Sequence, residues 1–185
     1  MAEEQVTLQQ FFEQLLPTGF AAQREAGNAV PQDFTMQYLV SGDGGGDWHV
    51  SIKDGAITAK QGKDDAVLTF RLTAADFLDA INSRNGAAPT LLLPASRPGR
   101  PDTSGRAKML KGTVAQELAR DGGDPFKVEM SFNGAEAPRA VVKMKLADFL
   151  AMQDGRLNGQ EAFMTGKLRI EGDMALMMQV AALTA

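Results

Sequence analysis

The chain has 185 residues, no cysteine and one histidine, with 44% apolar residues, 23% charged residues and a net charge of −4. This length and composition favour a single globular domain. The absence of cysteine excludes disulfides, thiolate catalysis and cysteine-ligated metal sites, and the acidic balance argues against general nucleic-acid binding. The N-terminus has no signal-peptide pattern and no apolar stretch is long enough to span a membrane, so we expect a cytoplasmic location.

Residues 7–16 have the pattern of an amphipathic helix. Thr7 and Gln10 have the spacing of a capping box, and four apolar side chains between residues 8 and 15 fall on one helix face. We expect Pro17 to end this helix.

The next segment alternates between apolar and polar residues. The alternation predicts strands at 34–40, 48–52, 57–59 and 68–72, with Asp54-Gly55 as a tight hairpin turn. Thr73 and Asp76 then have the spacing of a helix cap, so we expect a helix that folds back onto one face of the sheet.

The middle of the chain is rich in proline, glycine and arginine. Residues 84–106 contain four of the eight prolines, and residues 84–111 carry six Lys or Arg side chains against one Asp. We interpret 84–111 as an insertion that is either solvated or attracted to anionic membranes or to a CoA phosphate. Beyond it, the spacing of Leu110, Val114 and Leu118 predicts a helix, and alternation predicts a hairpin of strands 126–132 and 140–146.

One short sequence occurs twice. Residues 68–81 and 141–153 each contain an alternating strand that runs directly into Ala-Asp-Phe-Leu and a helix. Such an echo is consistent either with an internal duplication or with one copy in a core fold and the other in an embellishment.

The C-terminal segment combines a short helix, a strand and a second helix. Asn158 and Asp173 are expected to cap the two helices, Phe163 and Met164 to face inward, and Gly166 to supply a positive φ. The Gly-Lys at 166–167 lacks the spacing of a phosphate-binding loop. The last helix is apolar on two sides and therefore requires two apolar neighbours.

Five motifs in this part of the chain carry a family resemblance. They are Asp148-Phe149, Gly155-Arg156-Leu157, Ala162-Phe163, Gly166-Lys167-Leu168 and Gly172-Asp173. In this order they resemble the C-terminal half of the sterol carrier protein 2 (SCP2) family of lipid-binding domains. With the N-terminal helix and strands included, the resemblance covers about two thirds of the chain.

The resemblance implies an α+β fold with a mixed, mainly antiparallel sheet covered by helices on one face. Compared with the family pattern, this chain has an inserted extra hairpin and helix. We therefore expect a single SCP2-like domain over residues 1–185, with a Pro/Gly/Arg-rich insertion at about 84–125.

The same resemblance implies an apolar tunnel between sheet and helices that holds a sterol, fatty acid, acyl-CoA or phospholipid. The side chains expected to line it are Phe149, Met152, Phe163, Met164, Leu168, Ile170, Met174, Met177, Met178 and Ala181. Methionine suits such a wall because its flexible thioether adapts to ligands of different shape. We expect binding and transfer without catalysis, cofactor or metal.

A second interpretation uses the same apolar side chains differently. They could bury a homodimer or partner interface with no lipid bound. An enzyme is the weakest of the three classes, because one histidine and no cysteine leave no recognisable nucleophile and base.

Overall fold

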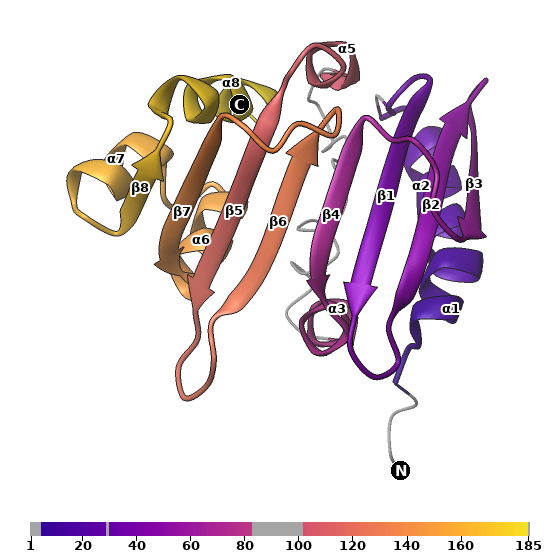
Figure 1. Cartoon of the computed structure of the whole chain (residues 1–185), viewed down its shortest axis with the longest axis horizontal. Helices are drawn as coiled ribbons and strands as arrows, with labels where there is room; N and C mark the ends of the chain where they lie inside the picture. Colours follow the sequence, from indigo (N-terminus) through magenta and orange to yellow (C-terminus); the bar gives the residue numbers. More distant parts are fainter. Residues whose placement is uncertain (1–4, 29, 83–101, 185) are drawn as a thin grey trace.

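The structure, a computed structural model, describes residues 5–28, 30–82 and 102–184. Over these residues the chain forms one eight-stranded sheet in the order β3-β2-β1-β4-β6-β5-β7-β8 (Figure 1). The strands are β1 Phe34–Ser41, β2 Gly46–Lys53, β3 Ala56–Gln61, β4 Leu68–Thr73, β5 Gly112–Ala119, β6 Phe126–Phe132, β7 Arg139–Lys145 and β8 Leu168–Gly172. The helices are α1 Leu8–Gln10, the π-helix η1 Phe11–Leu15, α2 Leu16–Glu25, α3 Ala74–Asn82, α5 Ser104–Ala107, α6 Leu146–Gln153, α7 Gly159–Met164 and α8 Met174–Thr184.

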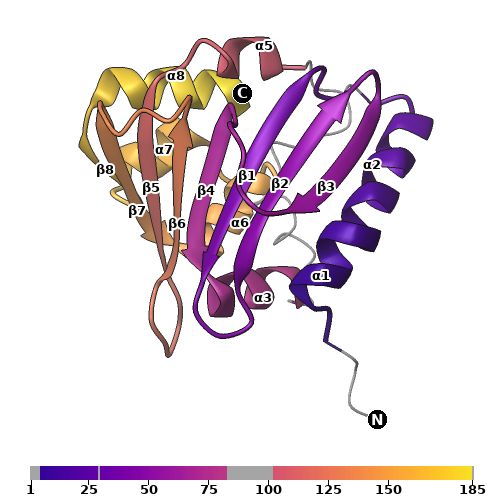
Figure 2. The ribbon, with the colours of Figure 1, turned by 45° about the vertical axis from the view of Figure 1, so that its right-hand side comes forward.

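The helices cover one face of this sheet. In Figure 1 the helix-free face is toward the viewer and α2 and α6 lie behind the strands, while the turned view of Figure 2 shows α2 running beside β3. β1–β4 and β5–β7 are parallel pairs, and the other five strand pairings are antiparallel. The expected α+β class, with a mainly antiparallel mixed sheet and helices on one face, is confirmed.

The N-terminal helix extends beyond its predicted end. It continues through Pro17 to Glu25, after the π-helical stretch η1. Pro17 is the second residue of α2, a position where a missing N–H is tolerated, so the expected stop at Pro17 was wrong. The predicted capping box is present, since Gln10 N donates to Thr7 Oγ1 at 3.2 Å and Thr7 N donates to Gln10 Oε1 at 2.9 Å.

Two other predictions in the middle of the chain were wrong. Residues 112–119 form β5 instead of a helix, because a spacing of four places Val114 and Leu118 on one face of a strand as well as of a helix. β6 and β7 do not form a hairpin, since β5 lies between them and pairs with both. Residues 84–101 of the expected insertion lie outside the described residues.

The two halves of the sheet repeat one arrangement. In the first unit (residues 34–82), the β1–β2 hairpin is followed by β4, which lies parallel to β1 and runs into α3. In the second unit (residues 112–184), the β5–β6 hairpin is followed by β7, which lies parallel to β5 and runs into α6. Both hairpin turns contain Asp-Gly-Gly and both helices begin with Ala-Asp-Phe-Leu after their first residue. The short sequence echo therefore marks a repeated topology.

The pairing of β4 with β6 joins the two units. In the second unit the place beside β7 is taken by the unit's own β8, but in the first unit the equivalent place beside β4 is taken by β6. The ion pairs of the two units differ in the same way, with a partner inside the second unit but across the seam for the first. Asp148 at the start of α6 pairs with Lys167 just before β8 at 3.2 Å, and the equivalent Asp76 pairs with Arg120 from the β5–β6 turn.

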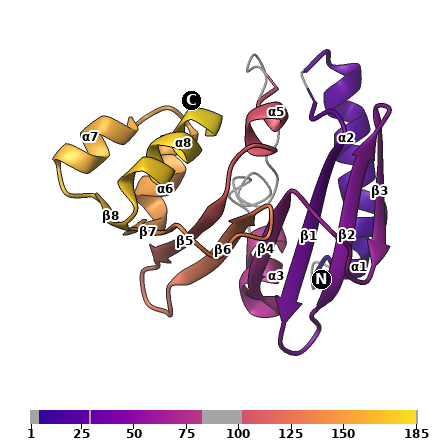
Figure 3. The same ribbon diagram turned by 45° about the horizontal axis from the view of Figure 1, so that its top comes forward.

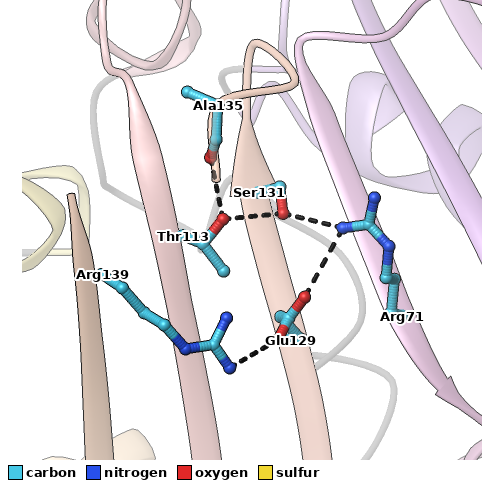
Figure 4. Close-up of polar contacts among 6 residues, drawn as sticks. All are labelled: Arg71, Thr113, Glu129, Ser131, Ala135 and Arg139. Atoms are coloured by element: carbon cyan, nitrogen blue, oxygen red, sulfur yellow. Dashed lines mark hydrogen bonds and ion pairs between the residues drawn. The ribbon is translucent and has the colours of Figure 1, made fainter. Parts of the chain in front are cut away.

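A chain of hydrogen bonds crosses this seam on the helix-free face (Figure 4). Arg71 Nη1 donates to Ser131 Oγ at 2.8 Å, and the Ser131 and Thr113 hydroxyls lie 2.9 Å apart. Thr113 Oγ1 donates in turn to the Ala135 carbonyl at 2.8 Å, so the Ser131 hydroxyl must donate to Thr113. Thr113 and Ser131 are 1% and 2% exposed, so each would leave an unsatisfied partner if it were lost.

Glu129 adds ion pairs beside this chain. Its carboxylate lies 3.6 Å from Arg71 Nη1 and 2.7 Å from Arg139 Nη2, so one acid on β6 contacts bases on β4 and β7. Both arginine side chains are about half exposed, so these pairs contribute little to stability compared with the buried hydroxyls.

Thr113→Val tests the buried hydroxyls of the seam. The substitution keeps the shape but leaves the Ser131 hydroxyl and the Ala135 carbonyl without their partner, so we expect a loss of about 1–3 kcal/mol in the free energy of unfolding. Urea denaturation measures this loss. Thr58→Val, at an exposed position of β3, is the matched control and should change stability by less than about 0.5 kcal/mol. Equal effects of the two substitutions would contradict this role for Thr113.

Candidate functional site

Three aromatic rings fill the helix-covered face of the first unit. Trp48, Tyr38 and Phe70 lie side by side on β2, β1 and β4, and are 5%, 0% and 1% exposed. The Tyr38 and Phe70 rings stack with centroids 4.9 Å apart, and Phe12 of the N-terminal helix stacks on Trp48 at the same distance. This part of the interior is occupied by the protein's own side chains.

The second unit has smaller side chains at the equivalent positions. Gln116 on β5 is paired with Val128 on β6 and with Val142 on β7, in the same register as the first unit's three rings. Both valines are buried. Two valines and one glutamine therefore stand where the first unit has Trp, Tyr and Phe, and they supply less volume between the sheet and its helices.

Gln116 is an unusual residue for this position. β5 lies inside the sheet, and Val114 and Leu118, on the same face as Gln116, are fully buried. Gln116 itself is only half-buried. Its amide offers both a donor and an acceptor on an otherwise apolar face.

Half of the ten predicted wall residues lie on the inner side of the second unit. Phe149 on α6 is buried and occupies the position that Phe77 has in the first unit. Met152 and Met177 are half-buried and pack against the core. Leu168 and Ile170 on β8 pair with Met144 and Val142 and share their inner face. These five side chains therefore lie on the same side of the sheet as Val128, Gln116 and Val142.

The other five predicted wall residues lie on the surface. The exposed fractions are 51% for Phe163, 76% for Met164, 46% for Met174 and 71% for Met178, and Ala181 is also exposed. The expectation that Phe163 and Met164 face inward was wrong. α7 is six residues long and its one fully buried side chain is that of Ala162, so the two larger side chains point away from the core.

α8 is held in place at its first turn. Leu176 N donates to the predicted cap Asp173 Oδ1 at 2.7 Å, and the Leu176 side chain is 2% exposed. Leu176 reaches the start of β5 at Gly112, where a Cβ would lie 2.9 Å from Leu176 Cδ2. Gly112 therefore permits the close approach of α8. The remaining apolar stripe of the helix, with Met174 and Met178, faces outward.

Two grooves of about 510 and 490 Å³ open on charged surfaces. The first includes Arg71, Glu129 and Arg139 on the helix-free face. The second lies at the ends of β7 and β8 and includes Lys143, where a hydrogen bond from Lys143 to Glu171 raises the pKa of the ammonium group. Neither is the apolar tunnel between α8 and the sheet that the family resemblance implies.

The described residues show neither a metal cluster nor a membrane-spanning helix. No group of three or more His, Asp or Glu side chains within them could hold a metal ion. No described helix is both long and apolar enough to cross a bilayer.

Comparison with known proteins supports the resemblance. Residues 96–185 match the model of the SCP-2 sterol transfer family. Among solved structures, the chain is similar to the sterol carrier protein domain 2 of Helicoverpa armigera, with 24% identity, a TM-score of 0.35, and coverage of 43% of this chain and 70% of that one. It is also similar to the inverting sec-alkylsulfatase Pisa1 from Pseudomonas sp. and to a double mutant of that enzyme, each at 11% identity with a TM-score of 0.22. The chain spans only 13% of the length of these sulfatases, although 82% of this chain is covered. No curated protein matches the chain.

The match to the SCP-2 sterol transfer family thus covers residues 96–185, just under half of this chain. The match includes all five motifs between Asp148 and Asp173 that predicted it. The line of small side chains at Val128, Gln116 and Val142 was missed in the sequence, because its signal appears only when the register of the two units is compared.

The buried Tyr38 provides a test of the packing in the first unit. Burial raises the pKa of this phenol far above its ordinary value, so the folded state keeps the proton while the unfolded chain loses it above about pH 10. Stability is therefore intact below that pH and should fall by up to about 1.4 kcal/mol per pH unit above it. Because Tyr38 is the only tyrosine, tyrosinate absorbance should appear only as the protein unfolds.

Tyr38→Phe is the control for this titration. It removes the ionisable group, so its stability should decline less steeply in alkali than that of the parent protein. Tyrosinate absorbance in the parent at pH values where circular dichroism still shows a folded protein would contradict the packing described for Tyr38.

Proposed function

We propose that this protein binds a hydrophobic ligand in the second unit, between the inner face of β5–β8 and helices α6 and α8, and transfers it unchanged. The ligand class is that of sterols, fatty acids, acyl-CoA or phospholipids. The observation that carries the proposal is the replacement of Trp48, Tyr38 and Phe70 by Val128, Gln116 and Val142 at equivalent positions. The family of residues 96–185, named for sterol transfer, supports it.

The side chains around these positions suit such a ligand. Phe149, Met152, Leu168, Ile170 and Met177 form the proposed apolar wall. At about 25 cal/mol per Å² of apolar surface, a buried acyl chain or sterol ring gains several kcal/mol without a charged partner. The half-buried amide of Gln116 would hydrogen-bond to the polar end of the ligand.

We infer that the protein is a carrier and not an enzyme. The single histidine, His49, lies on β2 of the first unit, and β1, β4 and β6 separate β2 from β5. It is therefore remote from the proposed ligand. A single domain over residues 1–185, acting in the cytoplasm, is the simplest setting for this function, because one sheet runs through both units.

The exposed stripe of α8 favours a second candidate function, an interaction module. Met174 and Met178 are 46% and 71% exposed, which a homodimer or partner interface would cover. Light scattering of the purified protein tests this: a dimer that Met178→Glu converts to a monomer would support it.

A membrane contact through residues 84–111 is a further part of the proposal. The described end of this segment lies against α8, where Thr103 Oγ1 and Arg106 Nη1 donate to the carbonyls of Leu183 and Ala182 at 3.1 and 3.4 Å. Its basic side chains would attract anionic lipid headgroups.

Filling the line of small side chains tests the ligand site. The double substitution Gln116→Tyr with Val142→Phe installs the first unit's residues in the second unit and should displace the ligand. Solvent extraction and mass spectrometry of the purified protein should find lipid in the parent and at least about tenfold less in the variant, the equivalent of about 1.4 kcal/mol. Displacement of a fluorescent fatty acid provides a second measurement.

Val141→Phe is the matched control. It adds the same ring at the preceding residue of β7, which faces the opposite side of the sheet, and should leave lipid retention unchanged. Val142→Ala enlarges the site and should retain lipid. This variant provides a second test if the double substitution impairs folding. A lipid-free parent, or equal retention by the filled and control variants, would contradict the proposal.

A further inference from the structure

The surface of α7 is apolar where it meets solvent. Phe163 and Met164 are 51% and 76% exposed at the end of this helix. The helix is fixed at both ends, since Glu161 N donates to Asn158 Oδ1 at 2.7 Å and Thr165 Oγ1 donates to the Glu161 carbonyl at 2.7 Å. The two apolar side chains are therefore presented on an ordered helix.

A basic groove begins at the next residue. The groove of about 490 Å³ is lined by Thr165, Gly166 and Lys167 of the α7–β8 turn, together with side chains of β7 and β8. Its cations are Lys143, Lys145, Lys167 and Arg169, and its acids are Glu117 and Asp148. The groove thus carries a local excess of two positive charges, four cations against two acids, on a chain whose net charge is −4.

Two of these cations remain available for a partner. Lys167 pairs with Asp148 at 3.2 Å, and Lys143 pairs with Glu171 at 2.9 Å. Within the described part of the chain, Lys145 and Arg169 take part in no ion pair.

We propose that the α7–β8 corner, defined as residues 163–169 with Lys145, docks this protein on an anionic lipid membrane. In such contacts aromatic and apolar side chains enter the interfacial region while neighbouring Lys and Arg contact lipid phosphates. The exposed Met174 and Met178 extend the apolar part, because α8 follows β8 directly and lies beside α7 in Figures 1 and 3.

A membrane fits these features better than a folded partner. Specific protein interfaces bury about 800 Å² on each side, whereas α7 offers one turn and a half of helix. Flexible methionines beside unpaired cations suit a fluid surface, which adapts to them and carries the complementary charge. This inference stands on surface residues and does not require the proposed ligand site.

Vesicle co-sedimentation tests the docking surface. The parent should bind vesicles of phosphatidylcholine and phosphatidylserine more tightly than phosphatidylcholine alone, and less tightly as salt rises. Phe163→Ser with Met164→Ser should weaken binding about tenfold or more through lost apolar burial. Lys145→Gln with Arg169→Gln should weaken binding about tenfold or more on the anionic vesicles only.

Matched controls change similar surfaces elsewhere. Leu15→Ser removes a side chain that is 48% exposed on η1, and Lys53→Gln with Lys60→Gln removes two exposed cations from β2 and β3. These variants should bind as the parent does. Circular dichroism checks that each variant is folded.

Two outcomes would overturn the proposal. The first is parent-like binding by both corner variants, and the second is equal loss in the controls. The variant with Gln116→Tyr and Val142→Phe should still bind vesicles although it loses its ligand. The experiments therefore distinguish failure of the proposed ligand site from failure of the docking surface.

Discussion

The antiparallel pairing of β4 with β6 is the contact on which the continuous sheet depends. β4 belongs to the first unit and β6 to the second, and each unit would otherwise expose the edge that this pairing covers. Thr113 and Ser131 place buried hydroxyls at the same seam, and the Asp76–Arg120 ion pair links a helix of one unit to a turn of the other. Neither unit is therefore complete alone. The protein is one sheet built from two incomplete copies of a common arrangement.

This common arrangement is used differently in its two copies. The first unit packs its rings into a dense aromatic cluster in which Phe12, Tyr38 and Phe77 contact one another. Aromatic pairs of this kind contribute beyond their buried area and leave little room for another molecule. In the second unit, Val128, Gln116 and Val142 stand at the positions of Trp48, Tyr38 and Phe70, while Phe126 and Phe132 are buried further along β6. The two copies therefore fill the equivalent positions of their inner faces with side chains of different size.

The helix caps of this fold were predictable from the sequence, whereas the strand order of the second unit was not. The caps at Thr7, Asn158 and Asp173 were predicted because each depends on residues three positions apart. The place of β5 between β6 and β7 depends on distant pairing, which no window of the sequence contains. At the candidate site, the inner positions of β8 followed from alternation. The exposure of Phe163 did not, because a helix of six residues is too short to define a buried face.

The distribution of aromatic rings between the units also decides what tryptophan fluorescence can measure. The chain has one tryptophan, Trp48, and it lies buried in the first unit against Phe12. Its emission therefore reports the environment of the first unit. Occupancy of the second unit would alter that emission only if the change were transmitted across β4 and β6. An unchanged fluorescence spectrum on adding lipid is thus no sign that the protein is empty.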